Sequence, residues 1–215
     1  MNQEYAYGQW SLVAGMIVVA LFFITRYVPT KTRFEKRSGG VLVAFITALF
    51  AEMYGFPLTI YLLSAQLGFE IPLSHSYGHL FAYLLTFIGI NIIFGWIFVM
   101  VASTIIIVQG LLWITRGWDQ VYASGGKLVT TGIYSRMRHP QYSGIILVAS
   151  GFLIQWPTLI TMILFPFLVR MYYRLAMKEE KDVEKVYGQE YEEYRKNVPA
   201  FIPKRRAFSQ YQEPA

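Results

Sequence analysis

Gly132-Ile-Tyr-Ser-Arg-Met-Arg-His-Pro-Gln-Tyr-Ser-Gly144 is the stretch of this 215-residue chain that decides its fold. It places two arginines, a histidine and two tyrosines between two strongly apolar segments. His139-Pro140 marks the start of a helix, because proline suits the first helical turn and disfavours helical geometry in the residue before it. We therefore expect the polar side chains at a helix N-terminus, at the mouth of a membrane-embedded helical hairpin.

The composition is that of an integral membrane protein. Hydrophobic residues make up 55% of the chain and charged residues 15%, which leaves too little polar surface for a soluble globule of this size. The absence of cysteine excludes disulfides and thiolate metal sites, and three scattered histidines do not predict a metal cluster. The net charge of +6 comes from basic residues beside apolar segments, a pattern typical of contacts with anionic lipid rather than nucleic acid.

Several apolar segments are long enough to cross a bilayer, which takes about 20 helical residues. The neutral to acidic start, followed by further apolar segments, argues against a cleaved signal peptide. We expect helices over residues 10–28 and 41–64, one long tilted helix over Leu80–Ile114, and two shorter segments over Tyr142–Trp156 and Thr158–Leu175. Gln155-Trp156-Pro157 interrupts the last two, which fits either two short helices or one kinked helix.

The positions of lysine and arginine decide between these two interpretations, because both residues prefer the cytoplasmic side. Residues 29–40 carry Lys31, Arg33, Lys36 and Arg37, whereas residues 66–79 carry neither type. This places the N-terminus outside and the stretch from Arg116 to Arg138 inside. A hairpin also returns the basic C-terminal residues to the inside, so we expect five transmembrane helices, N-out and C-in, the last two forming a short hairpin.

The first arm of this hairpin has a face of small residues. Ser143, Gly144, Ser150 and Gly151 recur along it. Such a face allows another helix to approach closely, so we expect helix packing there.

The composition changes sharply after Lys178. Val183, Tyr187, Tyr191, Tyr194 and Val198 recur at helical spacing among charged residues. This predicts an amphipathic cytosolic helix over Lys178–Asn197, laid against the membrane face or the helix ends. The expected organisation of this all-α integral membrane protein is a single folded domain. It has three N-terminal transmembrane helices over residues 1–115, a core over 116–203 and a basic tail over 204–215.

Polar residues at both ends of the hairpin are candidates for binding or catalysis. Arg136, Arg138 and His139 lie at the start of the first arm, and Glu179-Glu180 leaves the second arm at the same membrane level. These residues also fit plainer roles, as lipid anchors for the arginines and as a structural ion pair for Glu180. Two acids facing a basic motif fit a cationic ligand as well, and the pattern leaves both interpretations open.

Glu52 lies within the second apolar segment, where a carboxylate points to a functional role. Gly55 and Pro57 follow it closely and predict a locally broken helix. Glu52 could therefore bond the free backbone groups of this break instead.

A set of motifs over residues 120–203 points to a family. The motifs are Leu128-Val129-x-x-Gly132-x-Tyr134, Arg138-His139-Pro140-x-Tyr142-x-Gly144, Glu179-Glu180, Tyr187-Gly188-x-Glu190-Tyr191-x-x-Tyr194 and Val198-Pro199-x-Phe201-Ile202-Pro203. In order and spacing this set closely resembles the isoprenylcysteine carboxyl methyltransferase family and its phospholipid methyltransferase relatives. The first three apolar segments carry no motif of that family.

The resemblance implies an integral membrane enzyme that binds S-adenosylmethionine at the cytosolic face and methylates a lipophilic acceptor, an isoprenylcysteine-like carboxylate or a lipid headgroup. Carried over by position, the cofactor pocket comprises Lys127, Leu128, Val129, Tyr134, His139, Pro140, Gln141, Tyr142 and Glu179. Carboxylates and aromatic faces stabilise a sulfonium cation, which fits Glu179 with Tyr134 or Tyr142. Arg138 and His139 would secure the pocket.

The expected catalytic residues are Arg138, His139 and Glu180. Methyl transfer needs donor and acceptor held at reacting distance in a dry site. A carboxylate acceptor needs no base, whereas an amine or thiol needs one, for which Glu180 or His139 is the candidate. Glu52 and Arg174 are weaker candidates for substrate contact.

The acceptor itself stays open. The prenylcysteine enzymes carry a substrate-associated arginine four residues before the cofactor-binding glutamate, where this chain has Leu175, with Arg174 one place away. Phospholipid amines, other lipid acids and small lipophilic thiols therefore remain as acceptors besides a prenylated cysteine.

Two other functions fit parts of the sequence. Sterol-type reductases share a similar C-terminal stretch and use NADPH, but they usually carry more spans. A lipid-binding scaffold without turnover is the third hypothesis. Binding of S-adenosylmethionine, of NADPH or of neither separates the three.

Overall fold

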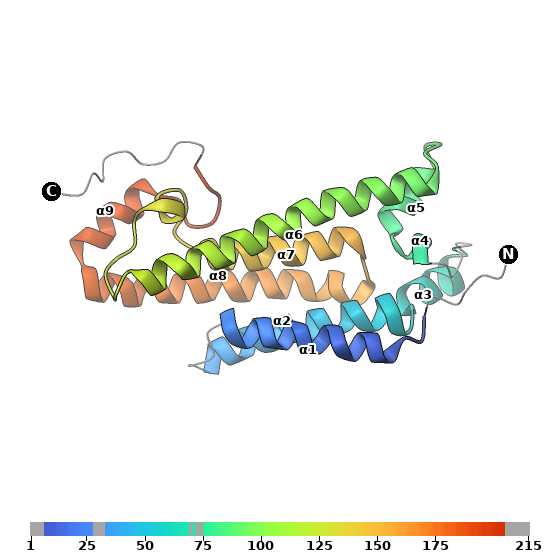
Figure 1. Ribbon diagram of the computed structural model, residues 1–215, viewed down its shortest axis with the longest axis horizontal. Coiled ribbons are helices and arrows are strands. Elements are labelled where there is room, and N and C mark those ends of the chain that lie inside the picture. Colours follow the sequence, from blue (N-terminus) through green and yellow to red (C-terminus); the bar gives the residue numbers. More distant parts are fainter. Residues whose placement is uncertain (1–6, 28–32, 69–70, 72–74, 205–215) are drawn as a thin grey trace. The chain divides into compact units, whose positions relative to one another are not determined.

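The computed structural model describes residues 7–27, 33–68, 71 and 75–204, and every regular element within these residues is helical (Figure 1). The all-α fold predicted from the sequence is thereby confirmed. Lys31, part of the predicted outer loop over residues 66–79 and all of the predicted basic tail except Lys204 lie outside the described residues.

Four helical segments in the described residues are long and apolar enough to cross a membrane. They are α1 (Trp10–Tyr27), α2 (Arg33–Phe50) together with the turn that follows it, α6 (Ile92–Ala123) and α8 (Leu159–Tyr187). These helices indicate an integral membrane protein. The apolar helix α7 (Pro140–Gln155) has only 16 residues, or about 24 Å, so the count of five crossings stays a prediction.

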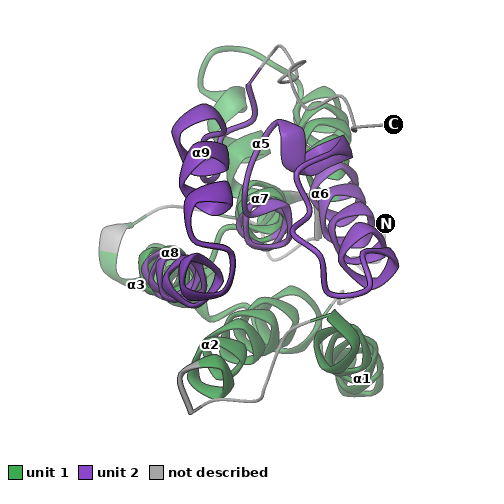
Figure 2. Ribbon diagram, turned by 90° about the vertical axis from the view of Figure 1, so that its left-hand side faces the viewer, with its two compact units in different colours: residues 1–107, 149–169 green, residues 108–148, 170–215 purple. Residues whose placement is uncertain are grey.

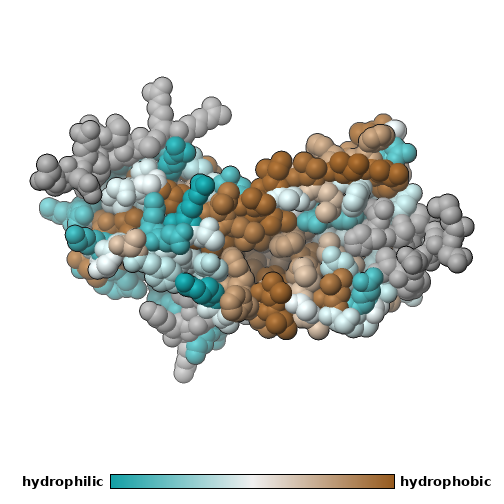
Figure 3. Space-filling view, viewed as in Figure 1, coloured by the Kyte–Doolittle hydropathy of each residue, from teal (hydrophilic) through white to brown (hydrophobic). Residues whose placement is uncertain are grey.

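Two units divide the chain, and each is assembled from separate parts of the sequence (Figure 2). Unit 1 contains residues 1–107 and 149–169, and unit 2 contains residues 108–148 and 170–215. Because α6, α7 and α8 each begin in one unit and end in the other, no single loop separates the two units. Figure 3 shows hydrophilic side chains gathered over α9 (Gln189–Asn197) and the end of α8.

The second predicted helix is broken where Gly55 and Pro57 predicted a break. One π-helical turn, Ala51–Gly55, follows α2, and α3 (Leu58–Leu67) begins after Pro57. Glu52 lies in the π turn with 4% of its surface exposed, and its Oε2 accepts a 2.7 Å hydrogen bond from the N–H of Thr59. The carboxylate therefore occupies the N-terminus of α3, where the free backbone donors and the helix dipole stabilise a negative charge.

The bounds predicted for the third helix are wrong. Residues 80–114 are divided between α5 (Leu80–Thr86), which follows the single turn of α4 (His75–Gly78), and α6, which runs 32 residues to Ala123. Gly89, shortly after α5, adopts φ +86°, a left-handed conformation that prevents α5 from continuing into α6. The side-chain oxygen of Asn91 accepts a 2.9 Å hydrogen bond from the N–H of Ile93 and so caps the start of α6.

Two helices follow Gly132–Gly144, which we call the opening stretch, as the hairpin interpretation required. α7 ends at Gln155, and Thr158 starts α8 by exchanging hydrogen bonds with Thr161. However, α8 continues without a break to Tyr187, so the start predicted for the C-terminal helix over Lys178–Asn197 is wrong, and a separate helix, α9, begins only at Gln189. Gly188, with φ +53°, provides the turn between α8 and α9.

Small residues bring α6 and α7 into close contact, which confirms the packing face predicted from Gly144 and Gly151. Within unit 2, a Cβ added to Gly144 would lie 2.6 Å from the carbonyl oxygen of Gly110. Within unit 1, a Cβ added to Gly151 would lie 3.1 Å from the carbonyl oxygen of Ser103. Only glycine fits where the two backbones approach this closely.

Candidate active site

A pocket of about 570 Å³ opens within unit 2, bordered by the end of α6, the loop leading into α7, and helices α8 and α9. Its volume falls in the usual range for sites that hold a small molecule or cofactor. Ten residues singled out from the sequence line it: Lys127, Leu128, Val129, Tyr134, Arg138, His139, Gln141, Tyr142, Glu179 and Glu180.

The opening stretch is held in place by the segment that follows α9. The N–H groups of Arg138 and His139 donate to the carbonyls of Pro199 and Ala200, at 2.9 Å and 3.0 Å. The hydroxyl of Ser143 donates to the carbonyl of Phe201 at 2.9 Å. Because Pro140 keeps the residue before it out of helical geometry, these N–H groups point away from α7 and bond the C-terminal segment instead.

One buried carboxylate joins the opening stretch to α8. Oε1 of Glu180 accepts hydrogen bonds from Nε and Nη2 of Arg138, at 2.9 Å and 2.7 Å, and lies 2.8 Å from Nε2 of His139. Nη1 of Arg138 donates to the carbonyls of Arg195 and Val198. Every nitrogen of the Arg138 guanidinium thus forms a hydrogen bond. These bonds connect the opening stretch to α8, to α9 and to the segment that follows α9.

A second carboxylate faces the aromatic residues of the pocket. The hydroxyl of Tyr142 donates to Glu179, and Nε2 of Gln141 lies 2.5 Å from the hydroxyl of Tyr134. Burial, with a smaller contribution from the charge of Glu179, raises the pKa of Tyr134 well above its usual range, although the bond from Gln141 lowers it. Tyr134 therefore stays protonated at neutral pH and can present a hydrogen to a ligand.

One wall of the pocket is formed by aromatic and apolar side chains that the sequence analysis did not identify as part of a site. Tyr191 and Tyr194 pack with Val198 and Leu128, and the hydroxyl of Tyr194 donates to the carbonyl of Tyr134 at 2.7 Å. Burial, aided by the negative charge of Glu180, raises the pKa of Tyr191 to about 12. Their helical spacing was visible in the sequence, but it was assigned to the membrane face or the helix ends.

Trp118 on α6 also lines the pocket. Its ring stacks on that of Tyr122 at 5.4 Å. No motif in the sequence distinguished this tryptophan from those expected at a membrane interface.

Three predicted residues lie elsewhere. Pro140 is fully buried, and an added Cβ on Gly117 of α6 would lie 3.1 Å from its ring. Arg174 is exposed on α8 and does not line the pocket. Glu52 belongs to unit 1, where it bonds Thr59.

The arrangement suits a ligand that carries a positive charge beside flat, apolar groups. Glu179 provides the negative charge, and Trp118, Tyr134, Tyr142 and Tyr191 provide aromatic surface. The fold and the pocket together describe a helical protein with helices apolar and long enough to cross a membrane and a cavity large enough for a small molecule.

Part of the chain matches a known family. Residues 116–190 match the family model described as phospholipid methyltransferase. This segment contains Trp118, the opening stretch and both carboxylates of the pocket. The resemblance to the isoprenylcysteine carboxyl methyltransferases and their phospholipid methyltransferase relatives is therefore confirmed for this part of the chain.

Individual relatives are also methyltransferases by name. Protein-S-isoprenylcysteine O-methyltransferase B of Arabidopsis thaliana is 36% identical over 78 residues, or 36% of this chain and 40% of the relative. Methanethiol S-methyltransferase of Crocosphaera subtropica is 31% identical over 116 residues, or 51% of this chain and 43% of the relative. Protein-S-isoprenylcysteine O-methyltransferase of Schizosaccharomyces pombe is 35% identical over 77 residues, or 35% and 33%. The matches thus span less than half the length of these relatives, and no solved structure matches the chain.

Proposed function

We propose that this protein is an integral membrane methyltransferase that uses S-adenosylmethionine and methylates a lipophilic acceptor at the cytosolic face of the membrane. One observation carries the proposal. The residues that line the pocket of unit 2 come largely from the segment that matches the methyltransferase family model, and they include a carboxylate set among aromatic rings.

The residues of the pocket fit this donor. S-adenosylmethionine supplies an activated methyl group on a positively charged sulfur. Glu179 would stabilise that charge, and Tyr142, which is 4% exposed and bonded to Glu179, would hold the carboxylate in place. Lys127, exposed at the rim, is a cation among the described lining residues that could bind the carboxylate of the donor.

Arg138 and Glu180 are proposed to position the pocket. Their charged groups already bond each other, and the guanidinium also bonds backbone carbonyls at the end of α9 and just after it. His139, bonded to Glu180, would remain the candidate base for an acceptor that must lose a proton. A carboxylate acceptor, as in the isoprenylcysteine relatives, would need no base.

The acceptor class is proposed from the names of the relatives. They act on an isoprenylcysteine and on methanethiol. We therefore propose a lipophilic molecule that bears a carboxylate or a thiol, or a lipid headgroup. The sterol-type reductase and scaffold hypotheses gain no support from these relatives.

Calorimetry with the full chain in detergent tests the proposal. Wild-type protein should bind S-adenosylmethionine and not NADPH. Glu179→Gln keeps an acceptor for the Tyr142 hydroxyl but removes the charge, so Kd should rise about tenfold, equal to about 1.4 kcal/mol. Glu190→Gln, which removes an exposed carboxylate from α9, is the matched control and should bind like wild type.

Labelled methyl transfer completes this test. Protein supplied with labelled S-adenosylmethionine should transfer the methyl group to a component of a membrane lipid extract or to a lipophilic thiol or carboxylate. Tight NADPH binding, or an unchanged Kd in Glu179→Gln, would contradict the assignment.

A further inference from the structure

A second cavity of unit 2, of about 770 Å³, shares no lining residue with the proposed cofactor pocket. One wall is a single face of α6, because Gln109, Trp113, Arg116 and Gln120 are spaced by three or four residues. The other wall comes from the 3₁₀ turn Gly132–Ser135 and the residues after it, including Arg136 and Met137, with Pro203 from the C-terminal segment.

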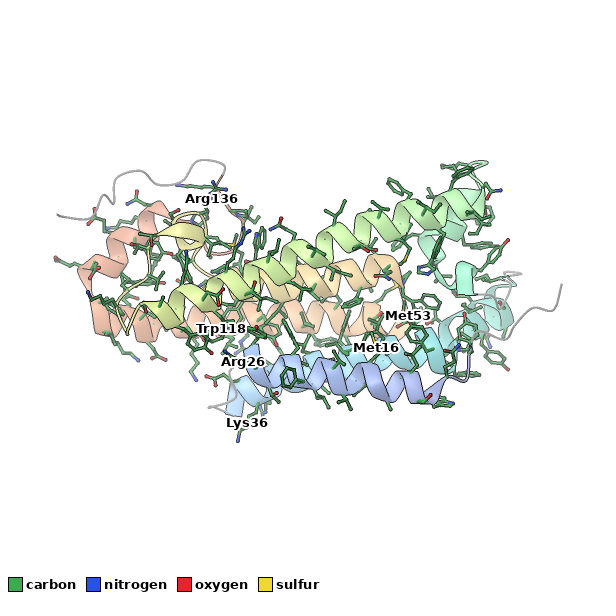
Figure 4. The ribbon with its side chains drawn as sticks, in the orientation of Figure 1. Met16, Arg26, Lys36, Met53, Trp118 and Arg136 are labelled. Atoms are coloured by element: carbon green, nitrogen blue, oxygen red, sulfur yellow. The ribbon has the colours of Figure 1, made fainter. Side chains whose placement is uncertain are left out.

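Two arginines of this cavity keep their charges available. Arg116 and Arg136 are exposed, and neither forms a salt bridge with any residue that the structure describes. The backbone of Arg136 is nevertheless held in place, because its N–H donates to Ile133 at 3.1 Å and its carbonyl accepts from Lys204 at 3.0 Å. Figure 4 shows Arg136 on the loop that leads into α7. Asp119 also lines the cavity, so the two arginines and this aspartate give the cavity a net charge of one positive charge.

The sequence of α6 indicates that the cavity lies at the depth of the lipid headgroups. From Ile92 to Thr115, 24 residues of α6 carry no charge, and they span about 36 Å, enough to cross the hydrocarbon core of about 30 Å. Arg116 is the first charged residue after this run, and Trp113 lies one turn before it, as is typical of the aromatic belt at the interface. Beside Pro203, Ile202 is 81% exposed, which suits contact with acyl chains.

A polar group in the same cavity is also unused. Oε1 of Gln120 is buried and accepts no hydrogen bond from the residues described. A buried acceptor of this kind normally has a partner, so it can receive a hydrogen from a bound molecule. A headgroup that offers a hydroxyl beside its phosphate fits this combination of groups.

We propose that this cavity binds an anionic membrane phospholipid, with Arg116 and Arg136 holding the phosphate and Gln120 accepting a hydrogen bond from a hydroxyl of the headgroup. Guanidinium groups recognise phosphate through paired hydrogen bonds, and Trp113 provides the apolar surface expected beside a glycerol backbone. The site would anchor this end of α6 to the cytoplasmic leaflet, independently of the methyl donor.

Native mass spectrometry of the full chain in detergent tests this site with phosphatidylglycerol and phosphatidylcholine as probes. Wild type should retain phosphatidylglycerol preferentially. The double variant Arg116→Gln/Arg136→Gln should lose this retention roughly 10- to 30-fold, since each basic residue near an anionic lipid adds to the attraction. Arg116→Lys/Arg136→Lys, which keeps both charges, should retain part of it.

Controls separate the site from general charge effects and from the proposed function. Lys36→Gln/Arg37→Gln removes two positive charges from α2 and should bind phosphatidylglycerol like wild type. Both Gln double variants should bind S-adenosylmethionine normally, because no residue changed lines the cofactor pocket. Equal binding of the two lipids, equal loss in both Gln double variants, or displacement of the lipid by millimolar inorganic phosphate would overturn the proposal.

Discussion

Arg138 joins several of the segments that border the pocket. It has 11% of its side chain exposed, and its partner Glu180 has 7%. A buried pair of this kind is costly to form, but removing one partner is costlier, because the other charge is left without compensation in a poorly solvated place. His139 and the carbonyl of Val198 bond the same pair, so the opening stretch, α8 and the C-terminal segment lose a common support if it is broken.

We predict that Glu180→Ala destabilises the protein by about 3 kcal/mol, for this reason. Thermal unfolding in detergent should show a Tm several degrees below that of wild type. Lys185 forms an exposed ion pair with Asp182, and the two side chains are 73% and 61% exposed, respectively. Lys185→Ala breaks this pair and should leave Tm unchanged. Equal Tm values for Glu180→Ala and Lys185→Ala would show that the buried network contributes no stability.

At the scale of elements, the contact between α6 and α7 sets where the opening stretch begins. Gly110 and Gly144 let the two backbones touch, and a Cβ on either would lie within 2.7 Å of the carbonyl oxygen of the other. One turn before Gly144, Pro140 and Gln141 pack on Gly117, so the start of α7 is held against the end of α6. This fixes the relative positions of Trp118 on α6 and Tyr142 on α7 within the pocket.

We predict that Gly144→Ala lowers the free energy of unfolding by about 1 to 3 kcal/mol, because the added methyl group forces the two helices apart. Thermal unfolding checks the stability, and calorimetry should show weaker binding of S-adenosylmethionine. Gly15→Ala, in α1, is the matched control, since its added Cβ would meet nothing within 4 Å. It should be neutral or slightly stabilising, because alanine favours a helix more than glycine does. A stable Gly144→Ala variant that binds the donor normally would contradict this account.

At the scale of the whole molecule, the orientation of the chain depends on the short helix α7. Its 16 residues span about 24 Å, less than the hydrocarbon core of about 30 Å. If α7 crosses the membrane, Lys196 on α9 and Gln66 on α3 lie on opposite sides. If it does not, both lie on the same side.

The chain contains no cysteine, so single cysteines can report this orientation without background. We predict that a membrane-impermeant maleimide labels Gln66→Cys in intact cells and labels Lys196→Cys only after lysis. Both positions are exposed, so a lack of labelling reflects the membrane barrier rather than burial. Labelling of both Gln66→Cys and Lys196→Cys in intact cells would mean that α7 does not cross and that the number of crossings is even.

The sequence predicted the elements whose ends carry strong local signals. Pro140 and Pro157 bound α7 because proline restricts its own backbone and that of the residue before it, and Gly55 and Pro57 predicted the break beside Glu52. The errors arose where composition was used instead of backbone signals. Nothing between Leu175 and Tyr187 stops a helix, so α8 continues through the change from apolar to charged residues.

The sequence by itself determined that this chain is helical and embedded in a membrane, because apolar length and helix-breaking residues act locally along the chain. It also determined the resemblance of residues 120–203 to a methyltransferase family, since the motifs keep their order and spacing. Only the tertiary structure decided the partners. Arg138 bonds Glu180 and Val198, 42 and 60 residues away, and Tyr191 and Tyr194 line a pocket rather than a membrane face. These contacts depend on how α8 and α9 fold back on the opening stretch. No local pattern of residues specifies a contact between residues so far apart in the sequence.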